Sequence, residues 1–591
     1  MKKIAGIVIA ALLCSTAAFA IPAWRGLVKY TQPDGSVITL QRHGDEFCHW
    51  TTDASGQLVE KDKDGWWKPV SRERLNTRRM AARAKRSVRR VSPRPSAGVA
   101  SGQKHFLVIL VAFSDVTFQS PTANEDFTRL LNEQGYNVNG STGSARDFYY
   151  ENSHGYFEPI FDVYGPVQLT SSMSHYGGND SDGYDLAPED ALIEGCQQLD
   201  NQIDFSIYDN DNDGEVDLVF MYYAGYGEAD SDYEDSIWPH QWDLSSAEKS
   251  LSLDGKKINS YACTNELVGY GVLAGMMCGI GAACHEFGHA MGLPDLYDID
   301  YDDYNGEAGG MYDYSLMCSG SYNNEGRTPP YFTLEERILL GWLSEDDFLE
   351  FPKSGNYTLT GINNNKAYRT PTDMDGEYFV YECRSGEGWD AYLPQSGLLV
   401  YHVDKSNRTV PIYVWNGSSY QKKNVTARSL WDEWETYNSI NENGSHPCYY
   451  VVPAGAQTNL NYTGSKFAFP VSATQNSYTA QSWNGVSSSI SLSNISYANN
   501  QVNLYASVPS SNIDYTVINN PGNGLYHAGD NFSLSLVEAE AESVSSVSWY
   551  FDDEPVSGNS VSLKAGSHTI EAVLTLSTGV VKTVTLELTA E

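Results

Sequence analysis

The sequence is short of basic residues. Lys and Arg number 38 against 75 Asp and Glu, which gives a formal net charge of −37. A strongly acidic surface repels phosphate groups, so the charge argues against nucleic acid and anionic membranes as partners and favours solubility. Together with many Tyr, Gly, Ser and Asn residues, it is typical of an extracellular protein made mostly of β-structure and loops.

Cysteine is also scarce, with nine in 591 residues. Cys14 lies in a predicted export signal and Cys48 in a predicted removable segment, which leaves an odd number of seven. An odd number after export means at least one free thiol or no disulfide framework at all. The spacings do not match a zinc finger or zinc ribbon.

No apolar run in the sequence is long enough to cross a membrane as a helix. The run Ile4–Leu13 follows Lys2 and Lys3 and precedes the small-x-small site Ala18-Phe19-Ala20. Such a run is too short to span a bilayer and is typical of a cleaved signal peptide. We therefore expect residues 1–20 to be a signal peptide. We also expect an exported protein, extracellular or at the cell surface, with no transmembrane anchor.

The chain is too long for one hydrophobic core, so several domains are expected. Residues 21–97 combine a small β-rich unit with a basic stretch, 72–94, that holds ten Arg or Lys residues and one acid. Proteases cleave exposed basic segments readily. We therefore predict a propeptide with a linker that a processing protease cuts.

Residues 98–345 have the pattern of an α+β domain. The continuous apolar runs 105–113 and 218–224 predict buried strands of a mixed sheet. Residues 187–199 predict an amphipathic helix, and 144–150 predict the end of another helix.

The rest of the chain is predicted to form β-sandwich domains. Short alternating strands separated by Gly, Asn and Ser predict one sandwich over 346–508. A second over 509–591 is expected to be Ig-like, with Trp549 as a candidate for its core.

The segment His285-Glu286-Phe287-Gly288-His289 contains the candidate metal ligands and the candidate general base. Two histidines four residues apart lie on one face of a helix, where neutral imidazoles can bind one Zn²⁺. Glu286 can then accept a proton from the zinc-bound water and later give it to the leaving amine. This arrangement predicts peptide-bond hydrolysis with Glu286 as the general base.

The residues that follow sharpen this prediction. Gly292 permits a left-handed turn, and Pro294 prevents the helix from continuing, so Asp295 can return to the metal as third ligand. Glu307 is an alternative third ligand. Met317 lies in a tight turn of the kind that metzincin peptidases place beneath their zinc, and this turn favours Asp295. Tyr322 is a candidate for stabilising the oxyanion.

An acidic loop predicts structural Ca²⁺. Oxygen-bearing side chains alternate around a glycine at the sixth position, Gly214, as in the first half of a calcium loop. The residues are Asp209, Asp211, Asp213, Glu215 and Asp217. The twelfth position is Phe220, so this is no EF-hand, and a solvated acidic turn is the alternative.

The motif from His285 to Asp298, with Ser315–Gly320 after it, resembles the immune inhibitor A family of secreted metallopeptidases. Further segments resemble the family at Ile237–His240, Leu340–Trp342, Gly388–Pro394 and Gly397–Asp404, and Gly44–Trp50 resembles its propeptide. The resemblance covers about residues 25–508. It implies a metzincin-type zinc endopeptidase, made as a zymogen, with bound calcium.

We therefore predict a secreted zinc endopeptidase, with one catalytic Zn²⁺, that acts as a monomer on protein or glycoprotein substrates. In the zymogen, Asp45 or Cys48 is a candidate to occupy the open position of the zinc. Two alternatives stay open: a surface adhesin or glycan-binding protein with a degenerate peptidase domain, and a mucin-directed peptidase.

Overall fold

The structure is a computed structural model. It describes residues 19–46, 48–79, 100–180, 183–231, 233–299, 308–415, 420–434, 439–509, 516–517, 526–537, 544–576 and 581–591. Residues 1–18 of the predicted signal peptide, residues 80–99 of the basic linker, and Glu307 lie outside the described residues.

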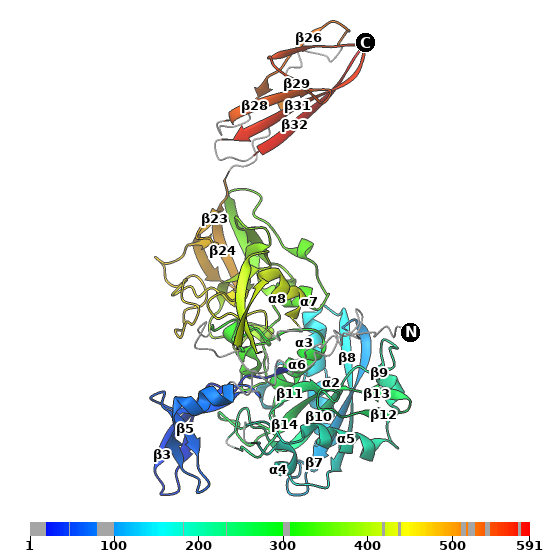
Figure 1. Cartoon of the computed structure of the whole chain (residues 1–591), viewed down its shortest axis with the longest axis vertical. Helices are drawn as coiled ribbons and strands as arrows, with labels where there is room; N and C mark the ends of the chain where they lie inside the picture. The colour runs from blue at the N-terminus through cyan, green and yellow to red at the C-terminus, as the bar shows by residue number, and fades with distance from the viewer. Residues whose placement is uncertain are drawn as a thin grey trace, which may run out of the picture. The chain divides into compact units, whose positions relative to one another are not determined.

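The chain is multidomain and of the α+β class, with many sheets and few helices (Figure 1). It divides into two compact units, one of residues 1–351 with 356–505 and one of residues 352–355 with 506–591. The helices are α2 (Ala123–Asn132), α3 (Ala145–Asn152), α4 (Met173–Gly177), α5 (Pro188–Leu199), α6 (Gly281–Ala290), α7 (Leu334–Leu339) and α8 (Ala427–Asp432).

A six-stranded mixed sheet forms the centre of the first unit. Its order is β1 (Phe19–Ala20), β11 (His240–Asp243), β14 (Ser260–Leu267), β10 (Val219–Tyr226), β7 (Gly102–Ala112) and β8 (Phe157–Gln168). The last four strands are parallel, whereas β11 and β1 run antiparallel to their neighbours. β7 and β10 are the two strands that the apolar runs predict, and they are buried over Phe106–Ala112 and Val219–Gly225.

Helices cover both faces of this sheet. One apolar cluster joins α6, α2 and α3 to one face, and a second joins α5 to the other. α5 begins one residue after the predicted start. The prediction for 144–150 is wrong in one respect: Ser144 is the N-cap at the beginning of α3 rather than part of a helix end, because its side chain and that of Asp147 form a capping box.

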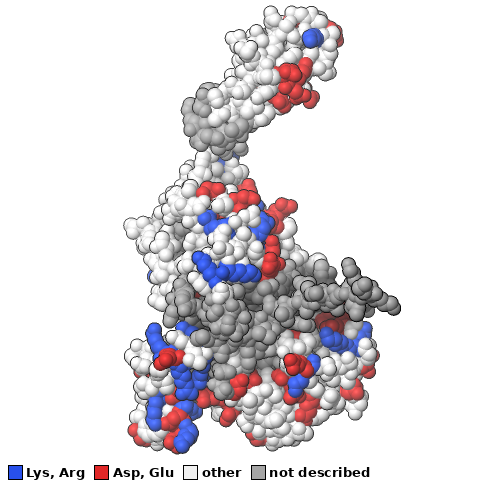
Figure 2. Space-filling model, in the orientation of Figure 1, with Lys and Arg blue, Asp and Glu red and all other residues white. Residues whose placement is uncertain are grey.

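The N-terminal part of the chain forms a separate five-stranded sheet. Its strands follow in chain order: β2 (Leu27–Thr31), β3 (Val37–Gly44), β4 (His49–Asp53), β5 (Leu58–Lys61) and β6 (Trp67–Pro69). Figure 2 shows Lys and Arg side chains gathered where β3 and β5 lie in Figure 1. Acids are interspersed with these cations, because residues 27–69 hold five Lys or Arg and seven Asp or Glu.

The remaining strands of the first unit form small sheets. Beside the central sheet lie β12 (Leu251–Leu253), β13 (Lys256–Ile258) and β9 (Glu215–Val216). Downstream lie β15 (Gly355–Thr360), β24 (Gln501–Ser507), β23 (Ser487–Ala498) and β22 (Tyr478–Gln481), then β16 (Tyr368–Pro371), β17 (Glu377–Arg384), β18 (Gly397–Asp404) and β21 (Tyr449–Val451), and the pair β19 (Thr409–Trp415) and β20 (Tyr420–Thr426).

The second unit consists of strands. They are β25 (Thr516–Val517) with β27 (Leu536–Val537), β26 (Asn531–Ser533) with β30 (Ser560–Ser562), and a sheet of β29 (Glu554–Val556), β28 (Val544–Phe551), β31 (Gly566–Leu576) and β32 (Val581–Ala590). Its core includes Ile570, Ala572 and Leu574, and Trp549 packs against this core only partly buried.

The described residues contain neither a disulfide bond nor a membrane-spanning helix. All eight cysteines among them are free thiols, and seven of these are buried. Within the same part of the chain, no helix is long and apolar enough to cross a bilayer.

Candidate metal centre

Helix α6 carries the two predicted histidines. His285 and His289 lie one turn apart and are both buried. The helix ends where predicted, because Gly292 adopts a left-handed φ of 101°. The NH of Leu293 donates to the carbonyl of Gly288 (3.0 Å), and that of Gly292 to the carbonyl of His289 (2.9 Å). This Schellman ending turns the chain back toward the histidines.

The chain that returns brings Asp295 to both histidines. Its Oδ1 atom lies 3.4 Å from Nε2 of His285 and 3.3 Å from Nε2 of His289, and the two Nε2 atoms are 3.1 Å apart. Neighbouring ligands of a tetrahedral zinc ion, with Zn–N bonds of about 2.0–2.1 Å, are about 3.3–3.4 Å apart. The three residues are therefore spaced as the ligands of one small cation.

The protonation of the rings supports the same interpretation. Nδ1 of His285 contacts the carbonyl of Leu316, and Nδ1 of His289 contacts the carbonyl of Leu293, each at 2.8 Å. A carbonyl oxygen can only accept, so Nδ1 carries the proton in both rings. The lone pairs of the two Nε2 atoms then face each other and a carboxylate, and only a cation between them makes this arrangement favourable.

Met317 packs against helix α6 at Gly288, the residue before His289. A β-carbon added at Gly288 would lie 2.9 Å from the Met317 sulfur, so the glycine is needed for this close approach. The same turn supports both ligand segments, because the carbonyl of Leu316 holds His285 and the carbonyl of Met317 accepts from the NH of Leu296 (2.8 Å). The turn thus fixes the helix and the returning chain relative to each other.

Glu286 is fully buried beside this cluster. Burial, together with the charge of Asp295, raises the pKa of Glu286 well above the usual range of a glutamate. Its Oε1 atom accepts a hydrogen bond from the backbone NH of Ile21 (2.8 Å). The carboxylate is therefore placed to exchange a proton with a group that occupies the position of the Ile21 nitrogen.

The segment around Ile21 lies along the site as a short strand. β1 pairs antiparallel with β11, in the register Phe19 with Gln241 and Ala20 with His240. The carbonyl of Ile21 then accepts from Nε1 of Trp238 (3.1 Å), and the phenol of Tyr322 donates to the carbonyl of Pro22 (2.7 Å). Tyr322, the candidate for the oxyanion, thus holds this segment.

Asp45 and Cys48, the predicted latency residues, lie elsewhere. Among the described residues, the group of possible metal ligands around α6 consists of His285, His289 and Asp295 and includes neither of them. The carboxylate of Asp45 accepts from the NH of Cys48 (3.0 Å) and closes a turn. The side chain of Cys48 lies in a small apolar cluster with Leu58, Leu75 and Tyr184.

The sequence did not indicate that distant residues hold Asp295 in place. Two buried side chains after β20 reach its neighbours: Oγ of Ser439 donates to the carbonyl of Tyr297, and Nδ2 of Asn441 donates to the carbonyl of Leu296, each at 3.0 Å. Ser439 also forms an isolated bridge with Asp295 itself. A buried, hydrogen-bonded asparagine in a loop gives no signal in the sequence.

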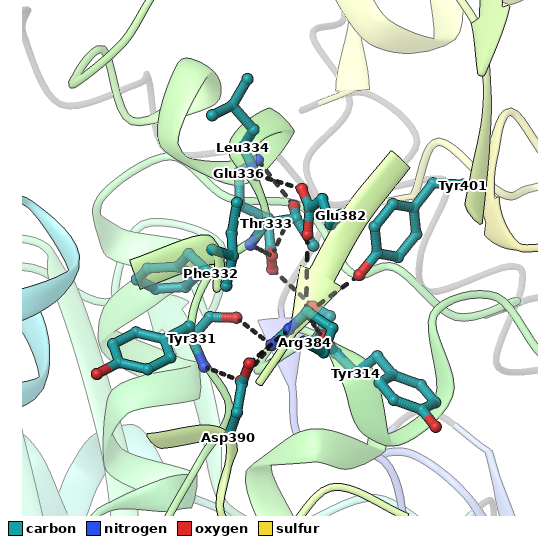
Figure 3. Close-up of polar contacts among 12 residues, drawn as sticks. Tyr314, Tyr331, Phe332, Thr333, Leu334, Glu336, Glu382, Arg384, Asp390 and Tyr401 are labelled. Carbon is teal, nitrogen blue, oxygen red and sulfur yellow. Dashed lines mark hydrogen bonds and ion pairs between the residues drawn. The ribbon is translucent and has the colours of Figure 1, made fainter. Parts of the chain in front are cut away.

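A second hidden support lies behind the methionine turn (Figure 3). Arg384 on β17 binds Asp390 through Nε (2.8 Å) and Nη2 (2.6 Å), and donates to the carbonyls of Tyr314 and Tyr331 at 3.1 and 2.9 Å. All of its partners are buried, and Tyr314 immediately precedes the turn. Glu336 completes the support, because its Oε1 accepts from Oγ of Ser315 (2.6 Å).

The acidic loop brings together three of its five predicted residues. The carboxylates of Asp209, Asp211 and Asp213 lie within 4.8 Å of one another. Lysines approach the same loop: Nζ of Lys256 lies 2.6 Å from Asp209, and Nζ of Lys257 lies 2.7 Å from Glu215. Asp217 instead accepts from the NH of Asn210 (3.0 Å).

These features together define a class. Two histidines one turn apart, an acid ligand after a helix-ending glycine, a glutamate beside the first histidine and a methionine turn are the parts of a metallopeptidase centre.

Comparison with known proteins gives the family. Residues 98–336 match the immune inhibitor A peptidase M6 catalytic domain. The predicted resemblance to the immune inhibitor A family is confirmed for this part of the chain.

Two similar proteins are named as an immune inhibitor A and as a metalloprotease. Immune inhibitor A of Bacillus thuringiensis subsp. alesti is 24% identical over 287 residues, which are 44% of this chain and 37% of that protein. The pre-pro-metalloprotease PrtV of Vibrio cholerae is 25% identical over 270 residues, 39% of this chain and 29% of that protein. The chain thus spans well under half the length of either.

Among solved structures, OgpA of Akkermansia muciniphila aligns over 84% of this chain and 98% of its own, at 10% identity. The TM-score of that alignment is 0.22, so it carries no argument about fold or substrate.

The support of Asp295 by Asn441 leads to a first prediction. We expect Asn441→Ala to weaken metal binding by about tenfold, because outer partners of metal ligands typically contribute that much. Zinc affinity of the full chain is measured by competition with a chromophoric chelator. Asn443→Ala is the matched control, since Asn443 is buried too but bonds to Pro411 and Ser445. Equal affinities in the two variants would contradict the prediction.

Proposed function

We propose that the chain is a secreted, zinc-dependent endopeptidase, made as a zymogen, that hydrolyses peptide bonds of extracellular proteins. The observation that carries the proposal is the buried group of His285, His289 and Asp295 with Glu286 beside it. An intact Glu286 and a complete ligand set favour an enzyme over an adhesin with a degenerate peptidase domain.

The donor set suits zinc. Two imidazole nitrogens and one carboxylate oxygen, with room for a further ligand, are the donors of catalytic zinc sites. When bound there, zinc polarises a carbonyl and lowers the pKa of a water molecule. Asp295 is the proposed third ligand, and the open alternative, Glu307, lies outside the described residues.

Each residue of the chain has a proposed task around that ion. Glu286 is the general base that takes a proton and later passes it to the leaving amine. β11 becomes the edge of the central sheet once β1 is removed, and a substrate can pair with it as an added strand. Met317 keeps the two histidines in register, as in metzincins.

The domain scheme completes the proposal. We assign residues 1–20 to a signal peptide, 21–97 to a propeptide, 98–345 to a metzincin-like catalytic domain, 346–508 to a β-sandwich domain and 509–591 to an Ig-like domain. We also propose that the exported protein is a monomer.

Contacts of the N-terminal segment support latency. Ile21, the first residue after the assigned signal peptide, bonds to Glu286, and the carbonyl of Pro22 accepts from Tyr322. Next to it, a cavity of about 320 Å³ lies between the N-terminal part of the chain and an acidic surface. One wall has Arg42, Lys61, Arg74 and Arg78, the last two paired with Glu60, and the opposite wall has Asp180, Glu228, Glu234 and Asp235. Asp45 and Cys48 stay candidates because their turn adjoins this interface.

Chelation tests the proposed activity. The processed protein, cut in the basic linker, should hydrolyse casein, lose this activity in a strong chelator and recover it with one equivalent of zinc. Release of acid-soluble peptides measures the rate. Zinc-loaded, folded protein that leaves casein intact would refute the enzyme and favour the adhesin.

Calcium is a separate proposal for the acidic loop. We expect Ca²⁺ to raise the melting temperature of the full chain, because the ion would replace Lys256 as the partner of Asp209 and relieve repulsion from Asp211 and Asp213. Differential scanning fluorimetry with Ca²⁺ or Mg²⁺ measures the shift. The control is Asp211→Asn with Asp213→Asn. An equal shift with and without these substitutions would rule the loop out.

A further inference from the structure

The position of Ile21 identifies one substrate subsite, provided that the proposed function holds. Glu286 gives its proton to the leaving amine, and the NH of Ile21 lies 2.8 Å from its Oε1 atom. The nitrogen of Ile21 therefore lies where the leaving nitrogen of a substrate would lie. It follows that the Ile21 side chain marks the subsite for the residue just after the cleaved bond.

The walls beside Ile21 are apolar. Ile21 and Ala23 pack with Ala229 and Trp238, and Ala282 and Tyr322 close the sides. Ile21 itself is 2% exposed. An aliphatic stem is therefore what the entrance of this subsite accepts.

Beyond Ile21 the subsite opens into a small cavity with mostly apolar walls and a few polar groups. Its volume is about 30 Å³, enough for a small polar group because one water needs about 10–15 Å³ on this measure. The polar residues that line it include Asp230, Thr264, Asn265 and Glu325. Two of these are carboxylates, and the described residues that line the cavity include no Lys, Arg or His.

Asp230 has no cationic neighbour among the described residues that line the cavity. Its Oδ2 atom accepts from the NH of Gly269 (3.2 Å), whereas Oδ1 is buried and has no hydrogen-bond partner among the described residues. Burial raises the pKa of Asp230 to about 7, and the charge of Arg42 opposes that rise. Arg42 belongs to the N-terminal sheet, where it donates to the carbonyl of Glu228. Removing the propeptide takes this cation away.

Glu325 contributes charge but is already engaged. Its two carboxylate oxygens accept from the NH groups of Val272 (3.2 Å) and Leu273 (2.8 Å). Asp230 is therefore the residue with an acceptor to offer a ligand. A buried acceptor without a partner destabilises the site, and a donor that arrives with the substrate removes this cost.

We propose that this cavity is the specificity pocket for the residue after the cleaved bond, and that it selects lysine through Asp230. The stem of a lysine matches the apolar entrance. Its chain extends two atoms past the end of an isoleucine and so carries the ammonium group into the cavity. A small ammonium group fits the volume better than a guanidinium.

Paired peptide substrates test the pocket in the processed enzyme. Two quenched fluorescent peptides differ only in lysine or norleucine after the cleaved bond, and mass spectrometry confirms where each is cut. We expect kcat/KM to favour lysine by about tenfold to hundredfold, the contribution of one hydrogen bond to a charged group. Asp230→Asn should bring this ratio near one. A wild-type ratio near one, or an unchanged ratio in the variant, overturns the proposal.

Glu266→Gln is the matched control. Glu266 is a buried acid on the neighbouring strand β14, and it bonds to the NH groups of Gln119 and Gly225 without lining the cavity. Its neutralisation should leave the lysine preference as in the wild type. If Glu266→Gln also loses the lysine preference, the preference comes from the overall negative charge around the site, and the proposed pocket is refuted.

A second measurement needs no hydrolysis. In the full-length precursor, Ile21→Lys and Asp230→Asn form a double-mutant cycle whose readout is the melting temperature. We expect Ile21→Lys to lower it by about 2 °C or more beyond additivity when Asp230 is neutralised. Additive effects overturn the pocket. If the processed enzyme cleaves neither peptide, the proposed function fails, and the cycle still decides the pocket.

Discussion

Glu286→Gln is expected to lower kcat/KM of the processed protein on a peptide substrate by about 10³-fold. General acid–base catalysis typically contributes about 10²–10⁴-fold, and glutamine keeps the shape of glutamate without a proton to exchange. The three proposed ligands are unaffected, because Glu286 does not belong to the group of His285, His289 and Asp295. The variant should therefore bind zinc as the wild type does.

Two measurements make this result specific. Zinc content by elemental analysis shows whether the metal stays, and steady-state kinetics give the loss of rate. Glu286→Asp serves as a matched variant, because it keeps the carboxylate but withdraws it by one methylene, and it should retain more activity than Glu286→Gln. A zinc-loaded Glu286→Gln protein with more than about a tenth of wild-type activity would remove Glu286 from the role of general base.

The parts of the site that could be predicted are local in the sequence. The four-residue spacing of His285 and His289, the left-handed Gly292 and the returning Asp295 lie within eleven residues. Helical periodicity and the conformational preferences of Gly and Pro operate over this distance. The buried strands β7 and β10 were predictable for a similar reason, since a continuous apolar run describes its own burial.

The parts that could not be predicted depend on contacts between distant segments. Asn441 holds the carbonyl of Leu296 across 145 positions of sequence, and Arg384 holds that of Tyr314 across 70. The sequence around neither residue indicates which carbonyl it binds. The acidic loop shows the same limit, because its alternating oxygens were visible whereas the approach of Lys256 was not.

Residues that follow the matched catalytic domain support the metal centre. The matched catalytic domain ends at residue 336, yet Ser439, Asn441 and Arg384 lie after it and reach the ligand loop and the methionine turn. The metal centre is therefore built by two parts of the chain. A fragment ending near residue 336 would leave the buried carbonyls of Leu296 and Tyr297 without these donors, which is costly in a buried site.

Ile21→Glu is expected to release activity from the uncleaved precursor. The substitution places a carboxylate in a buried position beside Glu286 and Asp230, where it finds no cation among the residues that line the cavity. An unpaired buried charge costs several kcal/mol, and every 1.4 kcal/mol changes an equilibrium tenfold. The N-terminal segment should therefore leave the site in a large share of molecules, and precursor activity should rise by at least about tenfold.

Leu27→Glu is the matched control for that result. Leu27 lies six residues further along the same segment but is 60% exposed, so the same substitution adds the same charge outside the site. The assay uses a peptide substrate with precursor whose basic linker is shown to be intact by mass spectrometry. Activity in the Ile21 variant alone assigns latency to the Ile21 segment. If Ile21→Glu stays silent while Asp45 or Cys48 variants become active, the turn that holds those two residues is the inhibitory element instead.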